Sequence, residues 1–213
     1  MTSNNGNLWL AETLWHLGAF EFGDFTVGRT AVGSPLYINP RKIIGHPGDL
    51  ARAALVIQEE IETLQAMRHP EIQHFDLVAG VPLGGLHIAT AYSLAANVPM
   101  IYLHPGRDED SIEGVYTPGQ TAIIMDDLVT GGGSIAETAE ALREAGLIVR
   151  DAFVLIDRQQ GARERLKRMG VNLRAALTLE VILNALHFNG LIEESWYRRS
   201  VQYLERNRGE NGN

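Results

Sequence analysis

The pattern of hydrophobic and polar residues predicts a chain in which strands and helices alternate. Short apolar runs, typical of strands buried on both faces, lie at residues 77–79, 100–103, 121–125, 152–156 and 175–177. Candidate helices lie at residues 47–67, 86–96, 134–145, 162–169 and 179–188. This alternation predicts right-handed βαβ units and therefore an α/β fold, a parallel sheet with helices on both faces.

The first 45 residues form a separate part of the pattern. Apolar residues at helical spacing predict a helix at 8–17, and aromatic and small residues around glycines predict short strands and loops at 20–39. We therefore expect an N-terminal helix with hood strands at 1–45, an α/β core at 46–208 and a disordered tail at 209–213. Ligands bind outside the carboxyl ends of parallel strands, where the small hood would cover them.

The most informative motif follows the apolar run at 121–125. The run ends in Asp126 and Asp127, after which come Thr130, Gly131, Gly132, Gly133 and Ser134. Glycines permit positive φ and close backbone approach, so successive N–H groups can converge on an anion. Ser134 and Glu137 have the spacing of a capping box, which predicts a helix start just after the glycines. The positive end of that helix would favour a phosphate.

Two carboxylates beside a phosphate cradle would repel the phosphate unless they serve another group. They suit a ligand whose hydroxyls donate hydrogen bonds, so the motif predicts a sugar-phosphate site. The alternative is a buried strand and a glycine-rich turn that the aspartates cap. The motif is not a Walker loop, since no lysine follows the glycines, and the spacing of a dinucleotide-binding fingerprint is absent.

Residues 124–134 resemble the diphosphoribosyl-binding signature of type I phosphoribosyltransferases. Other segments are similar to orotate phosphoribosyltransferases, in the order of that family and over roughly residues 8–190. They comprise the substrate segments 22–26 and 34–39, the pyrophosphate loop 80–85, the end of the mobile loop 112–114, and the strand and turn 155–161. Together they make the orotate branch the family that the chain resembles.

The resemblance implies a role for each segment. Asp126 and Asp127 would be the catalytic pair that binds the ribose hydroxyls of phosphoribosyl diphosphate. The rest of that binding site would be Leu128, Val129, Thr130, Gly131, Gly132, Gly133, Ser134, Gly84, Gly85 and Arg107. Orotate would contact Thr130, Arg158, Tyr37 and Ile38, with the Arg158 guanidinium on its carboxylate. Mg²⁺ would be carried on the diphosphate, with no metal ligand directly from the protein, and the chain would form a homodimer.

Structural roles are the alternatives for several of these residues. Arg158 could be a surface arginine paired with Asp157 or Glu164. Tyr37 and Ile38 could belong to the hood core. The pyrophosphate loop could be a simple glycine-rich turn between a strand and a helix.

Composition narrows the class of protein further. The 213 residues carry a formal net charge of −8 without a long basic run, which argues against a nucleic-acid partner. No apolar run approaches the ~20 residues of a membrane span, and the polar, uncharged first seven residues do not resemble a signal peptide. Cysteine is absent, which excludes disulfides and thiolate chemistry. These features predict a cytoplasmic enzyme for small molecules that binds neither nucleic acid nor membranes.

The resulting hypothesis is transfer of ribose 5-phosphate from phosphoribosyl diphosphate to orotate, giving orotidine 5′-monophosphate and diphosphate for pyrimidine nucleotide synthesis. The mobile loop of the family carries several cations, whereas the shorter loop at 104–110 combines Arg107 with the acids Asp108, Glu109 and Asp110. This difference favours an alternative, a catalytically weak or inactive binding protein that senses phosphoribosyl diphosphate or a nucleotide. A third hypothesis is a transferase with another acceptor, for which Arg158 favours a carboxylate.

Overall fold

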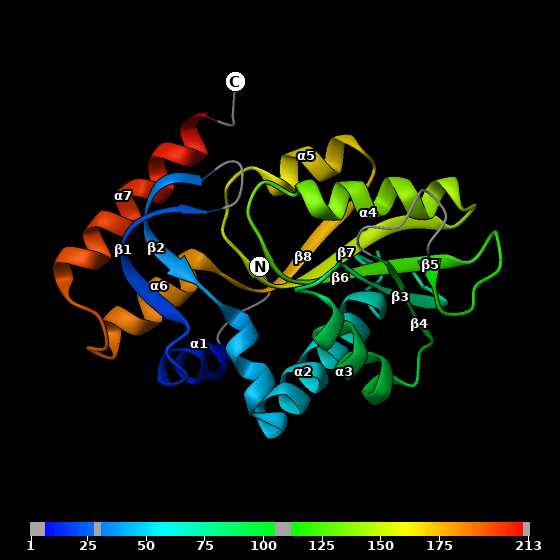
Figure 1. Cartoon of the computed structure of the whole chain (residues 1–213), viewed down its shortest axis with the longest axis horizontal. Coiled ribbons are helices and arrows are strands. Elements are labelled where there is room, and N and C mark those ends of the chain that lie inside the picture. The colour runs from blue at the N-terminus through cyan, green and yellow to red at the C-terminus, as the bar shows by residue number, and fades with distance from the viewer. Residues whose placement is uncertain (1–6, 28–30, 105–111, 211–213) are drawn as a thin grey trace.

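The computed structural model describes residues 7–27, 31–104 and 112–210. A six-stranded sheet lies between two layers of helices, and a two-stranded hood stands beside it (Figure 1). The core strands are β3 (Leu77–Gly80), β4 (Met100–Leu103), β5 (Ile112–Glu113), β6 (Thr121–Val129), β7 (Ile148–Asp157) and β8 (Asn172–Thr178). The core helices are α2 (Pro47–Gln65), α3 (Leu86–Ala96), α4 (Gly133–Glu144), α5 (Ala162–Arg168) and α6 (Leu179–Phe188).

The sheet confirms the predicted α/β fold with one correction at its edge. The strand order is β5-β4-β3-β6-β7-β8, and neighbouring strands from β4 to β8 are parallel. The edge strand β5 is antiparallel to β4, so the sheet is mixed and not wholly parallel. These residues resemble the end of a loop in sequence, because a strand of two residues is too short to show an alternating pattern.

Strand β6 is longer than its apolar run. It continues past Met125 to Val129 because its backbone keeps pairing with β7, where Asp126 lies opposite Val154 and Leu128 opposite Ile156. The carboxylates end the hydrophobic pattern and not the hydrogen-bonded ladder. Both aspartates are therefore held on a rigid strand and not on a turn.

Side chains of β6 alternate between the two helical layers. Ile123 and Met125 pack in the cluster that includes residues of α2 and α3, while Ala122 and Ile124 pack in the cluster with α4 and α5. Figure 1 shows the two pairs of helices on opposite faces of the sheet. Continuing the alternation places Asp126 toward α4 and Asp127 toward α3.

The hood combines both ends of the described chain. It contains α1 (Leu8–His16), β1 (Phe20–Val27), β2 (Ala31–Ile38), the 3₁₀ helix η2 (Pro40–Gly45) and α7 (Glu194–Glu210). β1 and β2 are antiparallel, and α7 packs against β2 and α6 (Figure 1).

Helix α7 was not predicted from the sequence. It begins in the segment 46–208 that was predicted as core, and it contacts both core helix α6 and hood strand β2. Its residues also include Gly209 and Glu210, which the sequence analysis had placed in a disordered tail. Residues 211–213 lie outside the described part of the chain.

A membrane-spanning helix is not found: no helix in the described ranges combines the necessary length with sufficient apolar character.

Candidate active site

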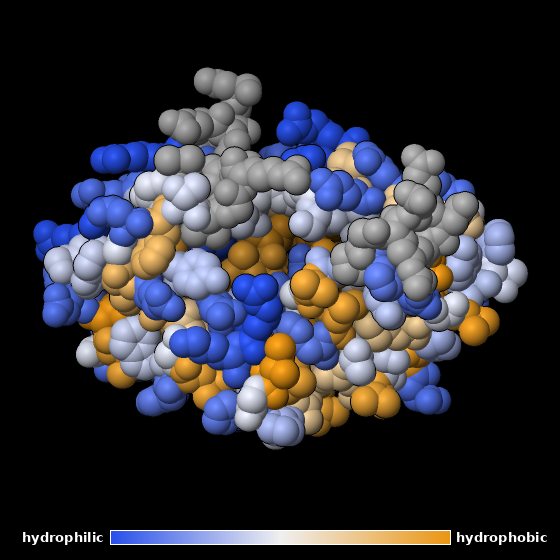
Figure 2. All heavy atoms as spheres, in the orientation of Figure 1, coloured by the Kyte–Doolittle hydropathy of each residue, from blue (hydrophilic) through white to orange (hydrophobic). Residues whose placement is uncertain are grey.

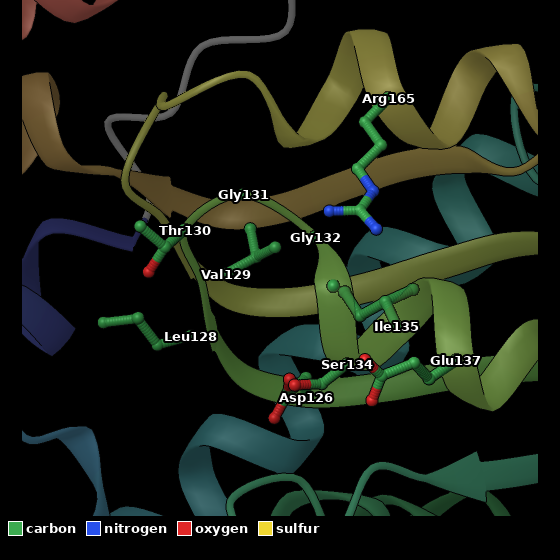
Figure 3. A pocket seen from close by; sticks show the side chains of 11 residues that line it. Asp126, Leu128, Val129, Thr130, Gly131, Gly132, Ser134, Ile135, Glu137 and Arg165 are labelled. Carbon is green, nitrogen blue, oxygen red and sulfur yellow. The ribbon is translucent and has the colours of Figure 1, made fainter. Parts of the chain in front are cut away.

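A cavity of about 350 Å³ opens where β6 meets α4 (Figure 3). Its walls are Asp126, Leu128, Val129, Thr130, Gly131, Gly132, Gly133, Ser134, Ile135, Glu137 and Arg165. All predicted phosphoribosyl residues from Leu128 to Ser134 thus lie around one space, at the carboxyl end of β6. This is the edge of a parallel sheet at which ligands bind.

Helix α5 packs closely against the glycine turn that lines the cavity. Gly132 has a φ of 74°, in the left-handed region that favours glycine. A Cβ at this position would lie 3.3 Å from Leu166 Cγ and 3.4 Å from Ala162 Cβ, so α5 packs directly against the turn. The first backbone N–H groups of a helix have no partner within that helix, so those at the start of α4 can receive a phosphate.

The start of α4 differs in detail from the predicted capping box. The helix begins at Gly133, and the residue that caps it is Gly132, without a side-chain hydrogen bond. Ser134 lies inside the first turn and its side chain is exposed, so the reciprocal bond with Glu137 is not formed at the expected position. Both side chains line the cavity instead.

Asp126 faces the cavity from the floor of the site. It is only 7% exposed, and its Oδ1 accepts a hydrogen bond from the Asp127 N–H at 2.9 Å. Burial, with the neighbouring Asp127 charge, raises the pKa of Asp126 well above its ordinary value. A buried carboxyl at this position needs donors from a ligand, which ribose hydroxyls can supply.

Asp127 points to the other face of the sheet and contacts the pyrophosphate loop. A Cβ on Gly84 would lie 2.3 Å from Asp127 Oδ1, and a Cβ on Gly85 would lie 2.2 Å from Met125 O. Only glycine fits at Gly85, because a backbone atom is in the way. The structure thus brings the two predicted glycines against the aspartate pair.

Two further residues of this region are not among the predicted site residues. Arg41 Nε lies 3.9 Å from Asp127 Oδ2, and the Arg41 side chain is about half exposed (49%). His87 at the start of α3 is half-buried, and burial lowers the pKa of its imidazole. No sequence motif marks either residue, because each reaches the site through packing of a separate element.

Arg158 is fully buried at the end of β7, with 0% of its surface exposed. Its Nη2 donates to Ser34 Oγ at 2.8 Å and to Leu36 O at 3.1 Å, both on β2. Within the described ranges, its Nε and Nη1 have no hydrogen-bond partner. Burial lowers the pKa of Arg158 to about 10.

The surface alternative for Arg158 is therefore wrong. Asp157 is paired with Arg163 at 2.7 Å and not with Arg158. The buried guanidinium links the core to the hood and still has two N–H-bearing nitrogens without acceptors, a costly arrangement unless a ligand supplies them.

The remaining predicted residues differ in accessibility. Tyr37 is half-buried, with its ring 5.8 Å from the Phe25 ring, centroid to centroid. Ile38 is 4% exposed and belongs to the core, so its side chain has no free face for a base and only its backbone could contact one. Arg107 lies outside the described residues.

Figure 2 shows a hollow in the middle of one face of the molecule, between the hood and the α/β core, with apolar and hydrophilic residues around it. Among the described residues, no group of three or more His, Cys, Asp or Glu side chains is arranged to hold a metal ion.

Sequence similarity to known proteins identifies the family of this chain. No family model matches the chain. The orotate phosphoribosyltransferase of Caenorhabditis elegans is 38% identical over 179 residues, which cover 82% of this chain and 75% of that protein. This chain belongs to the orotate phosphoribosyltransferase family.

Solved structures and longer relatives agree with this membership. The orotate phosphoribosyltransferase of Aeropyrum pernix superposes with a TM-score of 0.72 at 34% identity, covering 84% of this chain and 99% of the other. Bovine uridine 5′-monophosphate synthase is 34% identical over 202 residues, but they cover 93% of this chain and only 40% of that longer protein. Of the segment 124–134 that resembles the family signature, Asp126 and residues 128–134 line the cavity.

Proposed function

We propose that the protein transfers ribose 5-phosphate from phosphoribosyl diphosphate to orotate, yielding orotidine 5′-monophosphate and diphosphate. The observation that carries this proposal is the cavity in which Asp126 faces the glycine turn at the start of α4. It combines a carboxyl group for sugar hydroxyls with backbone N–H groups for a phosphate. Membership in the orotate phosphoribosyltransferase family supports the same reaction.

The acceptor is argued from Arg158. Orotate carries a carboxylate, and a guanidinium with free Nε and Nη1 groups matches a carboxylate bidentately. The residue is covered by β2 through Ser34 and Leu36, so we propose that orotate reaches it at the junction of hood and core.

The reaction is a substitution at C1 of the ribose. The bond from C1 to the diphosphate oxygen breaks and the oxygen keeps the electron pair, while orotate N1 forms the new bond to C1 and loses its proton to diphosphate or water. Positive charge develops on the sugar as diphosphate departs. A carboxylate fixed beside the ribose, as Asp126 would be, stabilises that charge.

The departing diphosphate needs positive charge on the Asp127 side of β6. Among the described residues, Arg41 is a cation on this side of the strand. Its partly exposed guanidinium lies near Asp127, at the border of the hood and the pyrophosphate loop. We propose that Mg²⁺ arrives as part of the substrate, bound to the diphosphate, where it would offset part of the negative charge. The oxygen atoms of the diphosphate are ligands of the kind that this ion prefers.

We further propose a cytoplasmic homodimer. Large apolar side chains at Leu94, Val115 and Phe188 expose 79%, 87% and 90% of their surface, which an interface could cover. The absence of cysteine means that no disulfide requires an oxidising compartment. Sedimentation analysis measures the oligomeric state directly, and a monomer at micromolar concentration contradicts the dimer.

The second candidate is a sensor that binds phosphoribosyl diphosphate or a nucleotide without turnover. The sequence of the loop at 104–110 favours it, since three acids stand where the family carries cations. Any such acids near the diphosphate would oppose its binding and its departure.

One experiment separates the two candidates. Orotate consumption is monitored with phosphoribosyl diphosphate and Mg²⁺, and calorimetry measures binding of each ligand alone. The transferase consumes orotate and forms diphosphate in equal amounts. Binding without consumption identifies the sensor, and neither binding nor consumption by the folded protein contradicts both.

A further inference from the structure

Arg165 is a cation in the wall of the phosphate cavity that no sequence motif assigned. It projects from α5 toward the turn between β6 and α4 (Figure 3). Helix α5 belongs to a different βαβ unit from the glycine motif, and Arg165 follows Gly132 by more than thirty residues. The fold and not the motif therefore brings the guanidinium to this place.

The charges of the cavity are unbalanced without it. The ionisable residues that line the cavity are Asp126, Glu137 and Arg165, so Arg165 is the only cation among its described lining residues. The chain as a whole is also negatively charged, with a formal net charge of −8. Backbone N–H groups supply only partial positive charge to a phosphate that carries nearly two negative charges. A full positive charge in the same wall supplies the missing complement.

The position of Arg165 is set by packing of the helix that carries it. The next residue, Leu166, is fully buried and lies against Gly132, where a Cβ would be 3.3 Å from its Cγ. On the cavity side, Arg165 Nη1 lies 3.8 Å from the place of a Cβ on Gly133. The guanidinium thus lies beside the first residue of α4, where free backbone N–H groups also converge.

The guanidinium has no competing partner within the described part of the chain. Its neighbour Arg163 is paired with Asp157, and Arg168 Nε donates to the Glu164 carbonyl oxygen. No side-chain hydrogen bond or ion pair holds Arg165, although it is exposed and five donors are available. Its side chain can therefore turn to a ligand without breaking an internal contact.

We infer that Arg165 is a phosphate-binding residue that completes the cradle and makes the site selective for ligands with a terminal phosphate. The inference rests on the proposed function, because it takes the 5′-phosphate of the phosphoribosyl group as the ligand. The planar guanidinium donates two N–H bonds to phosphate oxygens opposite the α4 amides. It stays away from the ribose and the base, so its contribution belongs to the phosphate alone.

The test compares ligands with and without the phosphate. Arg165→Ala is expected to weaken binding of ribose 5-phosphate and orotidine 5′-monophosphate by roughly 10- to 100-fold, as for loss of charged hydrogen bonds. Binding of orotidine, which lacks the phosphate, should not change. In turnover, KM for phosphoribosyl diphosphate rises and KM for orotate stays the same. Arg165→Lys restores part of the loss, since it keeps the charge without the fork.

Arg168→Ala is the matched control. It removes the same charge from the same exposed face of α5, but Arg168 does not line the cavity. Melting curves verify that all variants are folded. Both side chains are exposed, so we expect their replacement to leave the fold intact. Equal affinity for ribose 5-phosphate in the two alanine variants overturns the inference, and so does failure of the wild-type protein to bind ribose 5-phosphate.

Failure of the proposed function is recognised separately. If the wild-type protein binds ribose 5-phosphate through Arg165 but does not consume orotate, the role of Arg165 is supported and the proposed reaction is contradicted. If the protein consumes orotate and both alanine variants have the same KM for phosphoribosyl diphosphate, the proposed reaction is supported and the role of Arg165 is contradicted.

Discussion

Two adjacent aspartates at the end of β6 have different environments because strand side chains alternate between faces. Asp126 borders the phosphate cavity, whereas Asp127 lies against Gly84 and near Arg41. The sequence predicted that both would serve the sugar. Under the proposed function, Asp126 would serve the side of the 5′-phosphate and Asp127 the side of the diphosphate.

Asp126→Asn is expected to change stability and binding in opposite directions. The raised pKa means that the folded protein holds this proton more tightly than the unfolded chain, so stability falls as pH rises from about the ordinary value of 3.8 to the raised value. Asparagine removes that loss, and the variant is more resistant to urea at neutral pH than wild type. Loss of the charged acceptor weakens ribose 5-phosphate binding by about 1.5–3 kcal/mol.

Urea unfolding at several pH values, with calorimetry at pH 7, checks both effects of Asp126→Asn. Unchanged affinity in a folded variant removes Asp126 from the sugar site. A wild-type stability that rises across the same pH interval contradicts the assigned pKa direction.

Arg158→Ala is expected to raise KM for orotate and to leave KM for phosphoribosyl diphosphate nearly unchanged. Its unpaired Nε and Nη1 are the groups that a carboxylate would use, and losing a charged pair of hydrogen bonds raises KM by roughly 10- to 100-fold. Steady-state kinetics with each substrate varied in turn measures the two constants.

Ser34→Ala separates binding from the structural role of Arg158. It removes one acceptor of Nη2 and leaves the other two guanidinium nitrogens untouched, so it costs about 1 kcal/mol of stability without raising KM for orotate. Should Ser34→Ala reproduce the full kinetic effect of Arg158→Ala, Arg158 acts by holding β2 and not by contacting orotate.

At the scale of elements, the sequence was sufficient where hydrophobic periodicity was strong. Helix α3 and strand β4 have the predicted bounds, because each combines an apolar pattern with clear flanking residues. Strand β5 and helix α7 were missed for different reasons. The first has two residues, and the second is dominated by charged residues, with Ser200 and Leu204 as its buried side chains.

Site residues outside the predicted set have a different cause. A sequence motif predicts the positions only of residues close to it along the chain. Arg41 and Arg165 instead lie on separate elements, η2 and α5. Their places depend on the angles at which these helices pack, which no local pattern encodes. The glycine motif, in contrast, contains its own turn geometry and was predictable from residues alone.

Helix α7 is predicted to stabilise the hood through its buried side. Leu204 is 2% exposed and packs in the main core cluster, so Leu204→Ala should cost about 2–5 kcal/mol of unfolding free energy. The exposed neighbour Gln202 provides the control, and Gln202→Ala should change stability by less than about 0.5 kcal/mol. Equal unfolding free energies in the two variants would show that α7 is not docked in solution.

For the whole molecule, the central problem is a polyanionic substrate on a chain of net charge −8. The described structure meets it locally, with Arg165 at the phosphate cavity and Arg41 on the side of Asp127. The sequence at 104–110 holds Arg107 and three acids, and residues 105–110 lie outside the described part of the chain. Local charge at the site and not net charge therefore decides binding.

Replacing Glu109 and Asp110 by lysines is expected to raise the rate of phosphoribosyl transfer or tighten diphosphate binding. Two unit charges about 4 Å apart near a protein surface interact by roughly 4 kcal/mol before relaxation and salt screening. Initial rates at low and high salt measure the gain, which salt should reduce. Rates equal to wild type at both salt concentrations would show that these two acids do not approach the diphosphate.

Under the proposed function, the glycine cradle and Arg158 bind one ligand at the carboxyl end of the sheet. A crystal structure of the protein with orotidine 5′-monophosphate tests this most directly. We predict the phosphate between the α4 amides and Arg165, the ribose hydroxyls at Asp126, and the carboxylate at Arg158. A nucleotide bound elsewhere, or in the cavity with its carboxylate away from Arg158, would contradict the claim.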